Sequence, residues 1–336
     1  MVNIIVSTVC NMKCTYCFAE DHMLSAHDDR QPTFISLESF ERRLDDLDRS
    51  GINEIRLIGG EPTLHPQFDA LIEQARRRNK HIVVFTHGLI PDRIVTVLEA
   101  IPPDDCTILV NTNATRQSTS PTDAEQSRRR AVLQRLGSRA LLGFTIYTPR
   151  AELDFLLPLV LDMGCQKKIR LGLAQPISGG SNRYLHPKQY PQVGHPIARF
   201  AHAAAQHGIT LELDCGFVRC MFSQDDLETL HTAGVDPAWR CNPILDIGVN
   251  GEAFHCFPLA NQAVVPSAEA ESAVNLRASL AGQVQPYRVA GIYKECSSCR
   301  FKLMGACTGG CLAATIKRFH DAPTLRLKVP EEVPDA

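Results

Sequence analysis

An alternation of apolar, β-branched runs with amphipathic runs extends over the first 180 residues and limits the fold more than any other feature. NIIVSTV and HIVVFTHG have the composition of buried strands, whereas QFDALIEQARRRN has the spacing of a helix with one apolar face. This alternation is typical of parallel strands joined by right-handed helical crossovers. Strands are predicted at residues 3–9, 54–62, 81–88, 106–113, 140–148 and 168–176, and helices at 37–50, 67–79, 91–101, 122–137 and 153–164.

Six βα units are fewer than the eight that close a (βα)8 barrel. The predicted fold class is therefore α/β, a partial (βα)6 TIM-like barrel followed by a small C-terminal cysteine-rich domain. After Pro176 the alternation stops, and a His/Pro-rich connector precedes a predicted helix at 197–208 and a strand at 209–217. The expected organisation is a barrel at 1–180, a connector at 181–235, a cysteine-rich domain at 236–320 and a tail at 321–336.

Charge and composition exclude several partners. The formal net charge of −2 gives no reason to expect nucleic acid or an anionic membrane surface. The arginine triplets at 76–78 and 128–130 are expected on solvated helix faces. The N-terminus has no signal-peptide pattern and no apolar run could span a bilayer, which favours a cytoplasmic protein. With 13 cysteines, such a protein is expected to hold metal rather than disulfides.

The stretch CNMKCTYCF places Cys10, Cys14 and Cys17 directly after the first predicted strand. A closed zinc site needs four ligands, and no fourth cysteine or histidine follows until His22. A cubane iron–sulfur cluster has four irons, so three cysteines leave one iron open to a small molecule. The GGEP run after the second strand and Asn111, at the end of the fourth, are expected at the same mouth of the barrel.

The order of these two motifs resembles the radical S-adenosylmethionine (SAM) enzymes. The resemblance implies that SAM chelates the open iron of the cluster held by Cys10, Cys14 and Cys17. Reductive cleavage of SAM then gives a 5′-deoxyadenosyl radical that abstracts a substrate hydrogen. A flavodoxin- or ferredoxin-type reductant is expected as a partner.

The same resemblance assigns roles to residues near the cluster. Tyr16 is expected near the adenine, and Glu61 is expected to accept a hydrogen bond from the methionine amine. Gly59 and Gly60 would let the backbone approach that amine. Two alternatives remain open: Asn111 and Asn113 bind the ribose or close Asx turns, and Arg170 pairs with the SAM carboxylate or with a surface acid.

The C-terminal cysteines resemble the SPASM domain, and the resemblance implies an iron–sulfur domain in this part of the chain. Its motifs are CNPILDIGVNGEAFHC, with an Asn-Gly hairpin turn, and CSSCRFKLMGACTGGC, with seven residues where the family has five. The last cysteine of the family pattern is missing. The resemblance assigns Cys241, Cys256, Cys311 and an upstream Cys220 or Cys215 to one auxiliary [4Fe-4S] cluster, and Cys296, Cys299 and Cys307 to a second.

The fourth ligand of the second cluster stays open between His320, Asp321, a substrate group and none, and a single auxiliary cluster is the alternative. Cys106 and Cys165 are expected to be buried, inert thiols.

The resemblance implies a maturase that oxidises, cross-links or epimerises a ribosomal peptide or protein side chain. The alternative is a small-molecule dehydrogenase or epimerase acting on an aminoglycoside or sugar. The first strand begins near residue 3, which leaves no room for an N-terminal leader-binding domain and favours the alternative. A non-enzymatic electron carrier is disfavoured because GGEP would then have no role.

Overall fold

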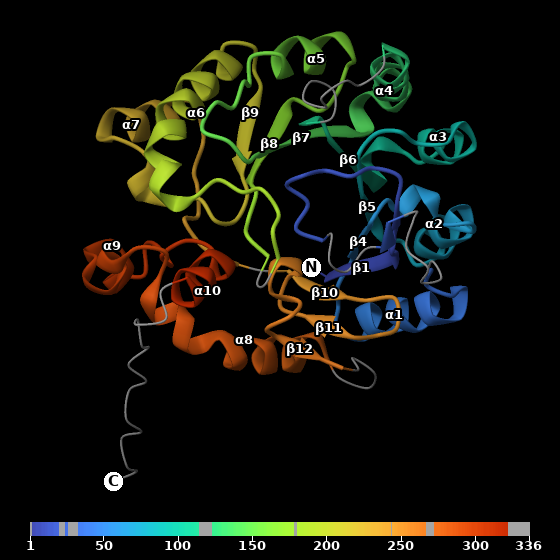
Figure 1. Ribbon diagram of the computed structural model, residues 1–336. Helices are drawn as coiled ribbons and strands as arrows, with labels where there is room; N and C mark the ends of the chain where they lie inside the picture. Colours follow the sequence, from blue (N-terminus) through green and yellow to red (C-terminus); the bar gives the residue numbers. More distant parts are fainter. Residues whose placement is uncertain are drawn as a thin grey trace.

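The computed structural model describes residues 2–19, 24–25, 33–113, 123–177, 180–242, 244–266 and 272–321 (Figure 1). In this part the main sheet has the order β12-β11-β10-β1-β4-β5-β6-β7-β8-β9. Its strands are β1 (Val2–Ser7), β4 (Glu54–Gly59), β5 (His81–Thr86), β6 (Cys106–Asn111), β7 (Ala140–Ile146), β8 (Lys168–Leu173), β9 (Thr210–Leu213), β10 (Leu245–Ile247), β11 (Ala253–Phe254) and β12 (Val264–Val265). A separate two-residue pair joins β2 (Val9–Cys10) to β3 (Leu24–Ser25).

Six strands pair in parallel in chain order, which confirms the predicted partial barrel: β1, β4, β5, β6, β7 and β8. Helices cover the outer side of the curved sheet, and the C-terminal helices α8, α9 and α10 lie beside the barrel (Figure 1). The helices are α1 (Leu37–Arg49), α2 (Phe68–Arg77), α3 (Asp92–Glu99), α4 (Asp123–Leu136), α5 (Leu156–Asp162), α6 (Tyr190–Ala205), α7 (Gln224–Thr232), α8 (Ala273–Ala290), α9 (Arg300–Leu303) and α10 (Leu312–His320).

Helix α1 illustrates why these segments fold where they do. Ser36 caps its N-terminus by accepting a hydrogen bond from the Ser39 amide. Phe40 and Leu44 are four residues apart and fully buried against the sheet. The alternating burial of β6, with even-numbered residues inside, shows the period of two that one barrel strand requires.

The connector differs from its prediction. Helix α6 begins at Tyr190 rather than at residue 197, so much of the expected loop is helical. Pro191 lies in the first turn, where its missing N–H costs no hydrogen bond, and Pro196 is accommodated inside the helix. Buried Tyr190 and Phe200 hold α6 to the core. The predicted strand forms β9, which pairs in parallel with β8 and lengthens the barrel.

The C-terminal region joins the barrel through its first hairpin. Strand β10 pairs in parallel with β1, and β11 returns antiparallel to β10, as the Asn-Gly turn predicts. Gly251 adopts a positive φ of 91° and its N–H donates to the Gly248 carbonyl. Because β10 continues the barrel sheet, Cys241 and Cys256 flank two strands that are fixed to the first barrel strand.

The arginine triplets are only partly solvated. Arg78 is paired with Glu41, Asp45 and Asp48 on the surface. Arg129, however, is 1% exposed, and the prediction of a solvated position is wrong for it. In the described ranges, no helix is long and apolar enough to cross a bilayer.

Candidate functional site

The loop that follows β1 brings Cys10, Cys14 and Cys17 together. The Cys17 N–H donates to the Cys14 carbonyl at 2.9 Å, which closes a tight turn between them. Burial raises the pKa of Cys10 to about 12, and the charges of Glu61, Cys14 and Cys17 act in the same direction. The three thiols therefore lie within electrostatic range of one another and of the acidic residue of the GGEP run.

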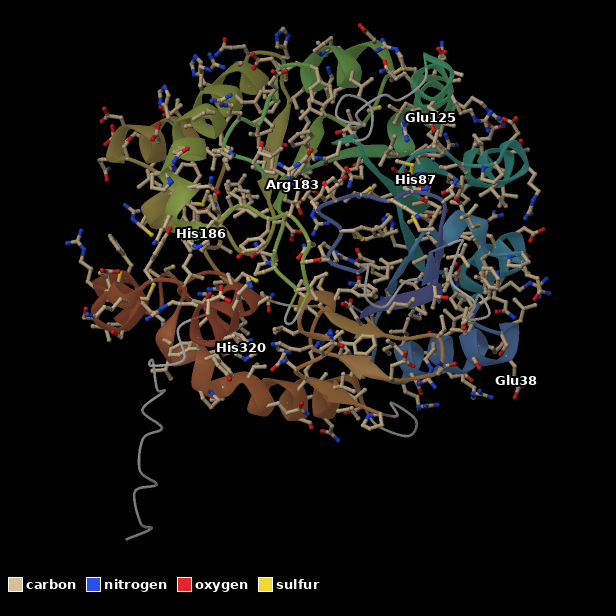
Figure 2. The ribbon with its side chains drawn as sticks, viewed as in Figure 1. Glu38, His87, Glu125, Arg183, His186 and His320 are labelled. Atoms are coloured by element: carbon tan, nitrogen blue, oxygen red, sulfur yellow. The ribbon has the colours of Figure 1, made fainter. Side chains whose placement is uncertain are left out.

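Segments from the far side of the barrel support this loop. The Arg183 N–H donates to the Thr15 carbonyl at 2.7 Å, and the Arg183 guanidinium lies 5.6 Å from the centre of the Tyr147 ring. Tyr16 stacks on Tyr147 with ring centres 4.8 Å apart and planes at 18°. In Figure 2, Arg183 and His87 both lie in the middle of the molecule, inside the ring of helices. The cysteine loop is thus held from both sides of the barrel.

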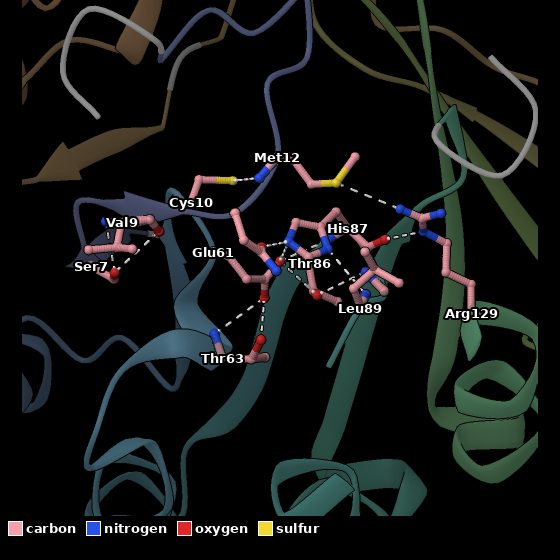
Figure 3. Close-up of polar contacts among 12 residues, drawn as sticks. Ser7, Val9, Cys10, Met12, Glu61, Thr63, Thr86, His87, Leu89 and Arg129 are labelled. Atoms are coloured by element: carbon pink, nitrogen blue, oxygen red, sulfur yellow. Dashed lines mark hydrogen bonds and ion pairs between the residues drawn. The ribbon is translucent and has the colours of Figure 1, made fainter. Parts of the chain in front are cut away.

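Glu61 is fully buried and both of its carboxylate oxygens accept hydrogen bonds (Figure 3). Oε1 accepts from the Thr63 hydroxyl at 2.6 Å and from the Thr63 N–H at 3.2 Å. Oε2 accepts from the Thr86 hydroxyl and from the His87 N–H, each at 3.0 Å. This carboxylate therefore ties the loop after β4 to the end of β5.

Gly59 and Gly60 are required by a close approach inside the protein. A Cβ at Gly59 would collide with the Ser7 carbonyl oxygen, and one at Gly60 would collide with the Val9 carbonyl oxygen and stand 2.9 Å from Cys10 Cβ. The Gly60 N–H donates to Ser7 and the Glu61 N–H donates to Val9. The two glycines thereby let the GGEP run pack directly against the cysteine loop.

The side chains at the end of β6 divide between two roles. Asn113 is 1% exposed, and its amide pairs twice with the Thr145 backbone, donating and accepting at 2.7 Å. Asn111 accepts from the Asn113 N–H at 3.0 Å, which is an Asx turn, and its Nδ2 lies 3.4 Å from the Tyr16 hydroxyl. Asn113 is committed to the scaffold, whereas Asn111 faces the cysteine loop.

Arg170 pairs with acids of β9 and the residue after it. Its Nη2 lies 2.7 Å from Asp214 Oδ1, and its Nε lies 3.4 Å from Glu212 Oε1. This is the ion-pair alternative that the sequence leaves open. The Arg170 side chain is mostly buried, whereas Glu212 and Asp214 are partly exposed. Neither contact connects Arg170 to the three-cysteine loop.

Two residues beside the loop are missed by the sequence reasoning. His87 Nε2 lies 2.7 Å from Asn11 Oδ1, and Arg129 donates through Nε to the His87 carbonyl at 3.2 Å. Arg129 also points Nη2 at Met12 Sδ, 3.8 Å away (Figure 3). Burial lowers the pKa of Arg129, and the charges of Glu125 and Cys14 oppose it. Helical spacing relative to buried Val132, Leu133 and Leu136 is the signal that would have placed Arg129 on the inner face of α4.

A first group of four cysteines lies between the end of β9 and the C-terminal hairpin: Cys215, Cys241, Cys256 and Cys311. Cys241 and Cys311 form a buried pair in which a hydrogen bond from Cys311 lowers the pKa of Cys241 to about 7. Burial and the charge of Cys241 raise the pKa of Cys256. Burial and the charges of Asp214, Cys241 and Cys256 raise the pKa of Cys215. Of the two upstream cysteines that the sequence offers for this group, Cys215 is the one that lies near Cys241 and Cys256.

A second group contains Cys296 and Cys299 of the CSSC run, with Cys307 and Cys220. Burial raises the pKa of Cys296, and the charges of Cys307 and Cys299 act in the same direction. Cys220 lies in the 3₁₀ helix η7 (Arg219–Met221), far from the others in sequence. Cys106 and Cys165 are buried, as predicted, with pKa values raised by burial to about 11 and about 12.

The donor chemistry of both groups fits iron–sulfur clusters. Among the described residues, no three His, Cys, Asp or Glu side chains converge closely enough to enclose one metal ion. A cubane is larger than one ion and takes four cysteine thiolates, so the wider groups of four cysteines fit it.

Two buried polar side chains beside the first group support this fit. The Tyr190 hydroxyl and the Gln175 amide are buried beside each other and make no hydrogen bond to the rest of the described chain. A Cβ at Gly216 would stand 2.5 Å from Gln175 Nε2 and 3.7 Å from Cys311 Cβ, so that amide faces the cysteines.

Comparison with known proteins identifies the N-terminal part. Residues 4–132 match the Radical SAM superfamily. The match covers less than half of the chain, and in this range the chain is similar to radical SAM proteins. The matched range contains the three-cysteine loop, the GGEP run and Asn111.

Solved structures share the fold over most of the chain. Streptococcus suis SuiB bound to S-adenosylmethionine is 17% identical with a TM-score of 0.67, over 94% of this chain and 73% of SuiB. A structure of anSMEcpe with bound AdoMet and Cp18Cys peptide is 18% identical with a TM-score of 0.63, over 93% and 88%. This similarity confirms the predicted α/β fold class.

Curated relatives match over shorter stretches. GTP 3′,8-cyclase of Mannheimia succiniciproducens is 34% identical over 85 residues, which are 25% of this chain and 24% of the relative. An S-adenosylmethionine-dependent nucleotide dehydratase of Selenomonas ruminantium is 34% identical over 89 residues, 26% and 29% of the two chains. The matches thus span about a quarter of the length of these two relatives.

Proposed function

We propose that this radical SAM protein cleaves SAM reductively at a cluster held by Cys10, Cys14 and Cys17. When bound, the cluster and SAM supply a 5′-deoxyadenosyl radical that abstracts a hydrogen atom from the substrate. The observation that carries the proposal is that the three-cysteine loop at the carboxyl end of β1 packs directly against the GGEP run, which contains buried Glu61. Three thiolates leave one coordination position for a small molecule.

The chain's own residues would bind and orient SAM around this loop. The Tyr16–Tyr147 stack offers an aromatic face for an adenine, and Asn111 offers its amide beside Tyr16. The carboxylate of Glu61 accepts four protein hydrogen bonds, about as many as its two oxygens can take. A methionine amine would therefore bind Glu61 by replacing one of the rotatable threonine hydroxyl donors. Buried Arg129 brings a positive charge near the same loop and suits the methionine carboxylate.

We further propose two auxiliary clusters, held by the two groups of C-terminal cysteines. These cysteines would hold the clusters beside the barrel mouth, and a bound cluster would supply a one-electron acceptor or donor for a substrate there. Hydrogen bonds, charge and burial set the potential of such a cluster. The Gln175 amide and the Tyr190 hydroxyl, which make no hydrogen bond to the rest of the described chain, would provide donors for its sulfurs.

A peptide is the substrate class that we favour. SuiB is described in complex with a precursor peptide, SuiA, and anSMEcpe with the Cp18Cys peptide, and both share this fold over more than nine-tenths of the chain. The product would be an oxidised, cross-linked or epimerised side chain. A small molecule is the second candidate, supported by the nucleotide enzymes among the curated relatives.

The test is SAM cleavage after anaerobic reconstitution and chemical reduction. The wild type should release 5′-deoxyadenosine, and the Cys10→Ala/Cys14→Ala/Cys17→Ala variant should release none. Cys165→Ala removes a buried cysteine outside the three groups and should keep the activity. Wild-type turnover in the triple variant would end the proposal. Deuterium transfer from a labelled peptide, or instead from a labelled nucleotide or sugar, decides between the substrate classes.

A further inference from the structure

The segment DCGFVRC, after β9, contains two cysteines, Cys215 and Cys220, that lie beside different groups of cysteines. Cys215 lies two residues after the end of β9 and is partly buried. Cys220 is five residues further on, in η7, and the residue is exposed. The two are the only cysteines between the barrel and the C-terminal motifs. Their separation by one short turn allows each to reach a separate group.

Cys215 lies with the first group. The charges of Cys241 and Cys256 act on its thiol. The neighbouring Gly216 has a φ of 98°, and a Cβ there would contact Cys311 Cβ at 3.7 Å. All three other members of the group are therefore beside the Cys215 turn, and this group already has four cysteines without Cys220.

Cys220 lies with the second group. Partial burial raises the pKa of its thiol to about 11, and the charges of Cys296, Cys307 and Cys299 act in the same direction. Burial raises the pKa of Tyr293, three residues before the CSSC run, and the charges of Cys220 and Cys296 act in the same direction.

A ring contact anchors the same turn. The guanidinium of Arg219 lies 4.7 Å from the centre of the Phe301 ring, in the short helix that begins after Cys299. The residue next to Cys220 is therefore fixed to the helix next to Cys299.

The other candidates for this position are weaker. Asp321 pairs with Lys317 at 3.3 Å, and His320 ends helix α10 as an exposed residue (Figure 2). The chain has no cysteine after Cys311. A thiolate that is already among the three others is the better ligand for iron than an exposed imidazole.

We propose that Cys220 is the fourth ligand of an iron–sulfur cluster held with Cys296, Cys299 and Cys307, and that Cys215 completes the other auxiliary cluster. A ligand from the barrel side of the chain would thereby replace the missing last cysteine of the C-terminal motif. The inference rests on the proposed auxiliary clusters. Ligation by Cys220 would also fix the second cluster to the turn after β9, and therefore to the end of the barrel.

The test uses the full chain with Cys10, Cys14 and Cys17 replaced by alanine, so that only auxiliary clusters remain. This protein should hold about eight irons, at about four per cubane. Adding Cys220→Ala should alter the electron paramagnetic resonance signal of one cluster and leave the other unchanged. Adding Cys215→Ala is the matched control and should alter the other signal. Unchanged signals with Cys220→Ala, or the same signal altered by both variants, would overturn the inference.

Thiol footprinting gives a second measurement that needs no cysteine variant. Cys220 should be alkylated in protein stripped of iron and protected several-fold in the loaded protein. Full reactivity of Cys220 in protein that retains both auxiliary clusters contradicts its role as a ligand. The two possible failures are distinguishable. If the chain with alanine at Cys10, Cys14 and Cys17 folds but binds no iron, the auxiliary clusters themselves are refuted.

Discussion

Replacing Glu61 by glutamine should loosen the GGEP loop although the side chain keeps its shape. Each carboxylate oxygen of Glu61 accepts one backbone N–H, from Thr63 on one side and from His87 on the other. Glutamine has one oxygen and one NH2 group, so in either orientation an amide N–H faces a backbone N–H. The threonine hydroxyls can rotate, but the backbone donors cannot.

The magnitude follows from the number of donors left without an acceptor. One buried N–H without a partner costs about 1–3 kcal/mol, which raises the equilibrium constant of local opening about 5- to 150-fold. Glu61→Ala leaves both N–H groups without an acceptor and should cost about 2–6 kcal/mol. Glu73→Gln, on the half-exposed face of α2, is the matched control and should change stability by less than about 0.5 kcal/mol.

Hydrogen–deuterium exchange measured by mass spectrometry is the assay, because it reports local opening rather than global unfolding. Peptides covering residues 61–65 and 86–88 should exchange faster in Glu61→Gln and faster still in Glu61→Ala. The same peptides in Glu73→Gln should match the wild type. Wild-type exchange in Glu61→Gln would refute the reasoning, because it would mean that the carboxylate does not hold these two loops together.

Three further predictions concern the scaffold and the C-terminal cysteines. Tyr190→Phe removes a buried hydroxyl near Cys311 and should lower the midpoint potential of one auxiliary cluster by about 20–60 mV in a redox titration. Tyr293→Phe is the control, because the Tyr293 hydroxyl donates to the Pro187 carbonyl, and it should leave that cluster unaffected. Asn113→Leu leaves both Thr145 backbone groups unpaired and should destabilise the protein by about 2–5 kcal/mol in thermal unfolding; unchanged stability with weaker SAM binding would assign Asn113 to the nucleotide instead. Cys307→Ala should keep uncoupled SAM cleavage but sharply reduce product in a mass-spectrometric assay, and an unchanged product yield would make the second cluster dispensable.

The sequence predicts the barrel well because its strands are short, apolar and regularly spaced. The same reasoning misplaces the start of α6, since Pro191 and Pro196 resemble loop residues until the burial of Tyr190 is known. Arg129 is missed because an arginine triplet resembles a solvated face, and only the inner side of α4 shows which of the three is buried.

The site shows a similar division between local and long-range information. Spacing alone brings Cys10, Cys14 and Cys17 into one loop. The choice between Cys215 and Cys220 depends instead on a turn after β9 that meets two distant segments, and no local pattern carries that contact. For Gly59 and Gly60, the sequence indicates a close approach, and the structure adds that Ser7 and Val9 of the chain itself make it.

The most direct test of the account is the electron paramagnetic resonance spectrum of the reduced, iron-loaded protein with and without SAM. One cluster, held by Cys10, Cys14 and Cys17, should change its signal when SAM is added, and the signals of the auxiliary clusters should stay the same. The SAM-responsive signal should be absent from the variant with alanine at these three positions. A spectrum in which no signal responds to SAM, or in which the response survives in that variant, would contradict the account.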